Sequence, residues 1–411
     1  MSNRISKNSR LKWVGFFLGT IYLSVLYTTS GWAAEPDIAQ KAAYQARFEE
    51  GANLFISGDY LRAAYIFEQL YTDTQSQRVK LEWARTIYFL GNKNKAKELF
   101  NEVLATNPPL PVREKINAFL DDIAISNGKF DYEFGVVRDT NPRAVPLNRT
   151  FNIFGTPLTY VPQFDTSPQY GLSYRLIASK SLDDYNKLVG SVSMYGIKFG
   201  STAFDRNNIE VGLAYRLSDT PRWQTRMAIE RMNFAGEHLY DYPSVSISNS
   251  VENTIGNIWT NEVKVGRMIY PVYSYLNGTL ISYSTSLMKN VSPKANVGIE
   301  LYIDRSRATE SAYAYRTNLV SLFGNLYQEN LGIKTQLKIL SSSKEYDATD
   351  PFFGEIRLDK RNSIILTLSA DRLNMFGVMP TFDLGYEKTN SNITFYTFDK
   401  VTAAISFKKS Y

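Results

Sequence analysis

The sequence predicts an all-β membrane protein, a transmembrane β-barrel of about fourteen antiparallel strands that follows a small α-helical domain. The first observation is strict alternation of side-chain character. In residues 209–217 every second residue, from Ile209 to Leu217, is apolar or aromatic, and the residues between them are polar or small. Because successive side chains of a strand point to opposite faces, such a segment has one apolar face and one mixed face. The same alternation recurs at 130–136, 170–176 and 295–303.

The length of these runs and the aromatic content are the second and third observations. Many runs are about ten residues long, which is what a tilted strand needs to cross a bilayer. Aromatic residues make up 14% of the chain, with 28 Tyr and 24 Phe, as expected for a barrel with aromatic belts at the membrane interfaces. Residues 129–411 provide room for about fourteen strands, at roughly 20 residues per strand and connection.

Residues 1–34 have the pattern of a secretory signal peptide, with basic Arg4 and Lys7 before an apolar stretch and small residues Ala33 and Ala34 at its end. Much of the formal net charge of +6 lies in this segment, so the basic pI does not indicate nucleic-acid binding. The chain has no cysteine, which excludes disulfides, thiol catalysis and cysteine-bound metals.

Residues 35–128 are predicted to form a periplasmic helical domain, because apolar residues recur there with helical periodicity. A repeat is visible at a spacing of 33 residues, and its matched positions follow the small-residue and aromatic pattern of a tetratricopeptide unit. The matched pairs are Gly51 and Ala84, Gly58 and Gly91, Ala63 and Ala96, and Phe67 and Phe100. Residues 111–126 look like a capping helix, ended by Asn127 and Gly128.

In this register, one wall of the helical domain carries a set of candidate substrate-contact residues. Such walls commonly bind extended peptides, although a solvated face without a ligand is an equally open interpretation. The candidate residues are Gln45, Ala52 and Phe55 from one helix and Arg78, Arg85 and Tyr88 from the next.

Within the barrel region, turn residues predict hairpin turns at 183–186, 218–221 and 390–392. Longer polar loops are predicted at 139–167, 235–253 and 342–352. The alternation predicts that Glu210, Arg216, Glu300 and Lys334 face the interior. The last run, residues 401–407, ends near the terminal Tyr411 and resembles the closing strand of bacterial outer-membrane barrels, although Lys409 interrupts it. This ending predicts the barrel assembly machinery as a partner, and a membrane-spanning barrel predicts outer-membrane lipid as another.

The sequence carries no catalytic, metal or phosphate-binding motif that would indicate an enzyme or a cofactor. The single histidine, His238, is predicted at a loop or strand end, and a hydrolase that uses it is one open alternative. Acidic residues such as Asp183, Asp347 and Asp350 are predicted in turns, where Asp caps its own backbone.

The combination of a signal peptide, a short tetratricopeptide domain and a barrel of about fourteen strands resembles the surface lipoprotein assembly modulator family. The most local match lies at the end of the first strand, where Gly135, Asp139, Thr140, Asn141 and Pro142 resemble a family motif. The resemblance implies an outer-membrane translocator that delivers lipoproteins, or related secreted proteins, to the cell surface without a cofactor. The alternative is a porin or a polysaccharide-export barrel with a helical scaffold domain.

Overall fold

The computed structural model describes residues 38–411 except residues 154, 184–185, 220 and 254–256. The predicted signal peptide, residues 1–34, therefore lies outside the described residues. The chain forms two compact units, a helical one that reaches Ile123 and a strand-built one that comprises Ala124–Glu252 and Asn257–Tyr411.

The helical unit is built from helices joined by short connections. In the described residues these are α2 (Ile38–Ser57), α3 (Tyr60–Thr74), α4 (Gln77–Phe89), α5 (Lys93–Leu104) and α6 (Leu110–Asn127), the last of which continues into the barrel unit. Of the helices in this part of the chain, none has both the length and the apolar character to cross a membrane.

The positions that the sequence repeat relates are those at which the helices pack most closely. Ala63, Ala84 and Ala96 are fully buried, and the rings of Phe67 and Phe100 fill the space between helices. A Cβ on Gly51 would lie 3.0 Å from the Phe67 ring, closer than most such contacts, so glycine lets the two helices approach. Gly58 and Gly91 end the first helix of each pair with φ values of 85° and 89°, a conformation that favours glycine.

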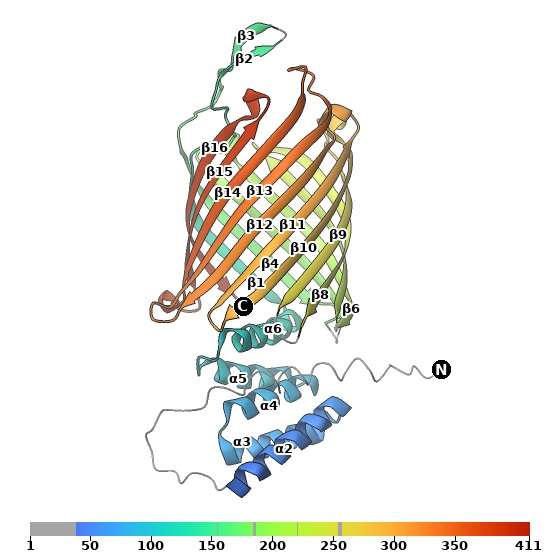
Figure 1. Ribbon diagram of the computed structural model, residues 1–411, viewed down its shortest axis with the longest axis vertical. Helices are drawn as coiled ribbons and strands as arrows, with labels where there is room; N and C mark the ends of the chain where they lie inside the picture. Colours follow the sequence, from blue (N-terminus) through green and yellow to red (C-terminus); the bar gives the residue numbers. More distant parts are fainter. Residues whose placement is uncertain (1–37, 154, 184–185, 220, 254–256) are drawn as a thin grey trace, which may run out of the picture. The chain divides into compact units, whose positions relative to one another are not determined.

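The second unit is a closed antiparallel barrel of fourteen strands, which confirms the predicted fold class (Figure 1). In the described residues its strands are β1 (Lys129–Asp139), β4 (Gln169–Ser181), β5 (Leu188–Phe199), β6 (Arg206–Asp219), β7 (Arg222–Phe234), β8 (Glu237–Glu252), β9 (Ile258–Met268), β10 (Gly278–Ser292), β11 (Ala295–Ala308), β12 (Tyr315–Gln328), β13 (Ile333–Thr349), β14 (Ile356–Ala370), β15 (Met379–Ser391) and β16 (Phe398–Ser410). Each strand pairs with its neighbours in sequence, and β1 closes the ring against β16.

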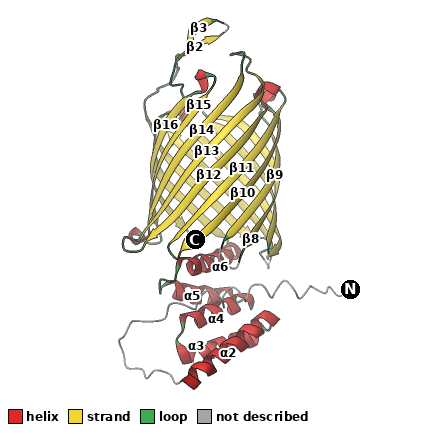
Figure 2. Ribbon diagram, viewed as in Figure 1, coloured by secondary structure: helices red, strands yellow, loops and turns green. Residues whose placement is uncertain are grey.

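The two faces of the wall differ as the alternation predicts. On β11, Val297, Ile299, Leu301 and Ile303 are exposed on the outer face, while Asn296, Asp304 and Ser306 on the other face are buried. The outer face is therefore the apolar one, and the polar side chains point into the barrel. Figure 2 shows the strands forming the wall, with short 3-10 helices in connections at its rims.

Two of the predicted polar loops are wrong. Residues 235–253 are mostly β8, and residues 342–352 are mostly the end of β13. The polar residues of β8 include Ser244 and Ser246, which are buried on the inner face, while Val245 and Ile247 between them are exposed outside. A strand with a polar inner face has few apolar residues, so its composition resembles that of a loop. The turn before β8 consists of Ala235 and Gly236, both with positive φ, as a two-residue hairpin turn requires.

The barrel has two distinct ends. β1 starts and β16 finishes at the first, here called the terminal end, and the opposite one is called the distal end. The longest connection between barrel strands, residues 140–168, lies at the distal end and contains a separate hairpin of β2 (Thr150–Ile153) and β3 (Thr156–Thr159). This hairpin stands beyond the barrel wall at the top of Figure 1.

Candidate functional site

The inner wall of the barrel is lined by ion pairs that run from strand to strand. Arg226 on β7 donates hydrogen bonds to Glu210 on β6, at 2.5 Å, and to Ser191 on β5, at 3.2 Å. On the other side, Lys338 on β13 donates to Glu300 on β11, at 2.8 Å, and Ser321 on β12 donates to the same carboxylate. These contacts place Glu210 and Glu300 inside, as predicted.

Arg216 and Lys334 also fall on the inner face by register. Arg216 has the same parity as Glu210 along β6, and Lys334 has the same parity as Lys338 along β13. The interior is therefore a charged, hydrogen-bonding surface rather than a packed apolar core. It also contains a hollow of about 200 Å³ between β7, β8, β9 and β10, bordered by Arg222, Gln224 and Glu262.

A group of tyrosines and cations lies on the inner face toward the distal end. Lys344 Nζ is 3.5 Å from the centre of the Tyr315 ring, and Tyr346 lies 5.7 Å from that ring. Arg357 stacks 3.4 Å from the ring of Tyr396 and pairs with Asp359 at 2.7 Å. Sequence reasoning missed this group, because the predicted loop at 342–352 removed Lys344 and Tyr346 from the barrel wall.

The motif residues at the end of β1 hold the seam where the barrel closes. Asp139 is fully buried; its Oδ1 accepts a hydrogen bond from the Asn141 backbone N–H at 2.9 Å, and its Oδ2 lies 3.3 Å from Arg206 Nη2 on β6. The Asn141 amide donates to the carbonyls of Val145 and Asp399, and Thr140 exchanges hydrogen bonds with Val401. The motif therefore joins β1, the loop that follows it, and the start of β16.

Gly135 lies in the middle of the same seam. A Cβ at this position would be 2.5 Å from the carbonyl oxygen of Ile405 and 2.9 Å from Ser173 Oγ. Glycine therefore lets β1 fit closely between β16 and β4. Nine consecutive residue pairs, from Asp131 with Ser410 to Asp139 with Thr402, close the seam. Pro142, the last residue of the motif, lies in the loop that follows β1.

The strand that closes the barrel continues to Ser410, so Lys409 does not end it. Its Nζ lies 4.3 Å from the centre of the Tyr411 ring, and Tyr411 in turn contacts Tyr132 of β1. A lysine beside interfacial tyrosines is a common arrangement where a membrane strand leaves the bilayer.

The loop at 140–168, here called the distal loop, contacts the rim on both sides. Arg143 donates to the Ala203 carbonyl at 2.8 Å and stacks on Phe164 and Phe234. In the other direction, Phe151 packs against Phe353 and Phe395 with ring centres 5.5 and 4.9 Å apart. These contacts reach from the end of β7 to the connection between β13 and β14.

Three of the candidate residues in the helical unit lie close together. The Arg85 guanidinium is 5.1 Å from the centre of the Phe55 ring, and both Phe55 and Tyr88 pack against Phe89 at 5.3 Å. Arg85 is buried in an ion pair with Glu82 at 2.6 Å, and Tyr88 donates to Asp122 at 2.8 Å. Phe89 itself is exposed, so this aromatic group reaches the surface.

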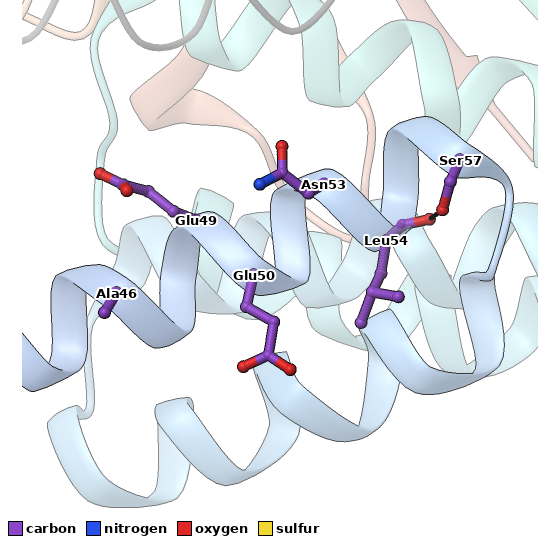
Figure 3. Close-up of a pocket in the computed structure, with 6 residues that line it drawn as sticks. All are labelled: Ala46, Glu49, Glu50, Asn53, Leu54 and Ser57. Atoms are coloured by element: carbon purple, nitrogen blue, oxygen red, sulfur yellow. Dashed lines mark hydrogen bonds between the residues drawn. The ribbon is translucent and has the colours of Figure 1, made fainter.

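The other candidate residues lie on or near α2. Gln45 is exposed and donates to Glu49 at 2.8 Å, beside a shallow hollow that is lined by Glu49, Glu50 and Asn53 (Figure 3). Arg78 stacks 4.6 Å from the ring of Phe48, and its buried Nε has no hydrogen-bond partner among the described residues.

Acidic residues in two predicted turns have the expected backbone contacts. Asp350 Oδ1 accepts hydrogen bonds from the N–H groups of Phe352 and Phe353. Burial alone would raise the pKa of Asp183, but hydrogen bonds from the Leu188 and Lys187 backbone N–H groups and from Ser181 lower it. These carboxylates stabilise turns, which accounts for their position without a catalytic role.

His238 lies at the start of β8 in an ion-pair cluster. Its Nε2 is 3.2 Å from Asp241, which also pairs with Arg231. Within the part of the chain that the structure describes, no serine or threonine hydroxyl is hydrogen-bonded to this ring. Across the described residues, no group of three or more His, Cys, Asp or Glu side chains is placed to hold a metal ion.

A closed barrel with an apolar outside and a polar, ion-paired inside defines an outer-membrane protein. The chain belongs to the surface lipoprotein assembly modifier family, whose family model matches residues 129–411. Membership of this family indicates an outer-membrane barrel with a role in surface lipoprotein assembly.

Several solved structures have a similar barrel fold. The channel DcaP of Acinetobacter baumannii has a TM-score of 0.42 at 8% identity, over 69% of this chain and 96% of that one. OprB of Pseudomonas putida has a TM-score of 0.41 at 8% identity, over 72% and 96% of the two chains. The anion-selective porin of Comamonas acidovorans has a TM-score of 0.39 at 8% identity, over 69% and 99%. These scores are too low to carry an argument about function, and a comparison with curated proteins finds no match.

Outer-membrane barrels turn short connections toward the periplasm and longer loops outward. Because the distal loop is the longest connection between barrel strands, the distal end is the one that faces the cell exterior, and the terminal end faces the periplasm.

Proposed function

We propose that this protein is itself the translocator that moves lipoproteins, or related secreted proteins, across the outer membrane. The polypeptide of the cargo passes through the polar lumen, and the helical unit receives the cargo on the periplasmic side. The observation that carries this proposal is the inner wall, where Glu210, Arg226, Glu300 and Lys338 form ion pairs along the wall and leave the interior polar. An extended polypeptide needs hydrogen-bonding groups along its path, and such a wall supplies them.

The lipid anchor of the cargo needs a different path. Each CH₂ group of an acyl chain that leaves an apolar environment costs about 0.8 kcal/mol, so a polar lumen strongly disfavours acyl chains. β1 and β16 are neighbouring strands with no connection between them, so they can separate without stretching a turn. We propose that the anchor passes along this seam while the polypeptide passes inside.

In the helical unit, Arg78 is the candidate contact residue with a donor to spare. Its guanidinium is held over Phe48, and its Nε is left without a partner in the described residues. Arg78 as a whole is only partly buried, so a carboxylate of the cargo would pair with its charged guanidinium and not with the buried Nε. We therefore propose that cargo contacts Arg78 and the neighbouring candidates Gln45, Phe55, Arg85 and Tyr88.

Substitution of Arg78 tests the helical part of the proposal. Arg78→Gln removes the charge and is expected to reduce the yield of cargo cross-linked to the helical unit in cells about tenfold. Arg62→Gln is the matched control, because Arg62 is an exposed arginine of the same unit paired with Asp59. Equal cross-linking in the two variants would remove Arg78 from the contact surface.

Deletion of the protein tests the transport function as a whole. Cells that express a candidate lipoprotein are treated with an external protease, with and without this protein. We expect the lipoprotein to be cleaved only when the protein is present. If surface exposure of every lipoprotein is unchanged by the deletion, the proposal is wrong. A porin would instead show an open conductance in planar bilayers that is independent of cargo.

The proposal also implies two partners that the barrel needs for its insertion into the outer membrane. The barrel assembly machinery would insert it through the closing strand β16, which ends near Tyr411, and lipid would surround its apolar face.

A further inference from the structure

Four arginines gather on the outer face of the barrel at its distal end. They are Arg267 on β9, Arg305 and Arg307 on β11, and Arg316 on β12. The strand register brings them together, because Thr279 of β10 pairs with Arg267 on one side and with Arg307 on the other. Arg305 pairs directly with Arg316 across the β11–β12 ladder. With strands about 4.8 Å apart, Arg267 and Arg307 have backbones roughly 10 Å apart.

The protein balances this charge only in part. Arg305 forms a two-pronged ion pair with Asp347, at 2.6 and 2.5 Å. Arg267, Arg307 and Arg316 form no ion pair within the described residues, although Glu345 faces Arg316 in the register and Glu310 lies in the adjoining connection. Like charges directly opposite each other destabilise a strand pair. The arginines therefore form an outward-facing site that an external anion would stabilise.

The site lies where the lipid-facing apolar band ends. Exposed Val263 and Val265 precede Arg267 along β9, and exposed Leu301 and Ile303 precede Arg305 along β11. At the distal, outward-facing end, this level is that of the headgroups of the outer leaflet. Guanidinium groups bind phosphate through two parallel hydrogen bonds, and several of them suit a headgroup with more than one phosphate.

We propose that Arg267, Arg305, Arg307 and Arg316 bind the phosphate groups of a bisphosphorylated lipid in the outer leaflet. The position beside the apolar band selects a lipid rather than free phosphate, because acyl chains can lie along Val265 and Ile303 while the headgroup meets the arginines. The site is roughly halfway round the barrel from the β1–β16 seam. A lipid bound there would hold β9–β12 together without restraining the seam. This inference rests on the outer-membrane location and not on the proposed translocation.

The test uses the full-length protein in neutral detergent, with bisphosphorylated lipid A as the probe. We measure binding by native mass spectrometry and the melting temperature of the barrel. The wild-type protein is expected to retain the lipid and to melt several degrees higher with it. Arg267→Gln, Arg307→Gln and Arg316→Gln together are expected to weaken binding at least about tenfold and to abolish the melting shift. Lys198→Gln, an exposed cation on β5, is the matched control and should behave as wild type.

Further measurements identify the ligand and exclude a folding defect as the cause of lost binding. Inorganic phosphate at the same concentration is expected to give no shift, and monophosphorylated lipid A a smaller one. Replacing the three arginines with lysine retains the charge but removes two-pronged binding, so intermediate affinity is expected. The proposal is overturned if the triple glutamine variant binds lipid A as wild type does. It is also overturned if free phosphate gives the full shift, or if the folded lysine variant binds no more weakly than wild type.

Discussion

Asp139 is fully buried at the distal end of β1, where its two carboxylate oxygens contact different parts of the chain. Asp139→Ala leaves the Arg206 guanidinium and the Asn141 N–H without their acceptor. We expect a loss of about 2 kcal/mol of stability and a lower melting temperature of the barrel in heat-modifiable gel mobility. Asp165→Ala, in the exposed part of the distal loop, is the control and should change the melting temperature little. An unchanged melting temperature in Asp139→Ala would show that Asp139 is not needed to hold the seam.

Lys80 in the helical unit gives a pH-dependent prediction. Burial lowers the pKa of its ammonium, but hydrogen bonds with Glu102 and Tyr71 outweigh burial and raise the pKa above its ordinary value of 10.5. A raised pKa stabilises the fold below pH 10.5, and this contribution is lost as the pH rises through the folded-state pKa. The melting temperature of the helices is followed by circular dichroism at about 222 nm. It should therefore fall more steeply with rising pH above that value.

Glu102→Gln removes the partner that raises this pKa, since Lys80 Nζ lies 2.6 Å from the Glu102 carboxylate. The variant should be less stable than wild type at neutral pH, by about 1 kcal/mol, because Glu102 is partly exposed. The difference between the two proteins should shrink as the pH rises above 10.5. A difference that is constant across this range would mean that Lys80 does not titrate as described.

At the scale of secondary-structure elements, a prediction concerns the seam between β1 and β16. Phe130 and Tyr411 exchange both backbone hydrogen bonds, so alternate pairs along the ladder are close, non-hydrogen-bonded pairs. Val137 and Ala404 form one of these. Cysteines at both positions suit a disulfide, and the chain has no other cysteine to interfere. Under oxidising conditions we expect surface display of a lipidated cargo to stop.

The same cross-linked protein distinguishes the two paths. A cargo variant without its lipid anchor should still be exported, because its polypeptide uses the lumen. Reduction of the disulfide should restore display of the lipidated form. If oxidation leaves display of the lipidated cargo intact, the anchor does not use this seam.

At the scale of the whole molecule, the sequence predicts the fold well because a lipid environment constrains it strongly. Residues such as Ile299 and Leu301 must be apolar outside, so the two-residue period is plain. The pattern failed at β8, where Ser244 and Ser246 face a polar interior and resemble loop residues. The site was harder to predict. Asp139 was found through the family motif, but its partner Arg206 is distant in sequence, and only the closed ring of strands brings the two together.

The distal loop contacts the barrel rim on both sides, and this arrangement predicts that the loop restricts the outer opening of the lumen. Arg143 and Phe164 anchor the loop near Phe204, while Phe151 anchors it near Phe395. Replacing residues 146–166 with a short Gly-Ser linker removes both the Phe164 and the Phe151 anchors. We expect the variant to raise single-channel conductance in planar bilayers severalfold and to make cells sensitive to vancomycin. Leu158→Ala, an exposed residue of β3, keeps the anchors and serves as the control. Conductance equal to wild type in the linker variant would mean that the restriction lies deeper, among the lumen tyrosines around Lys344.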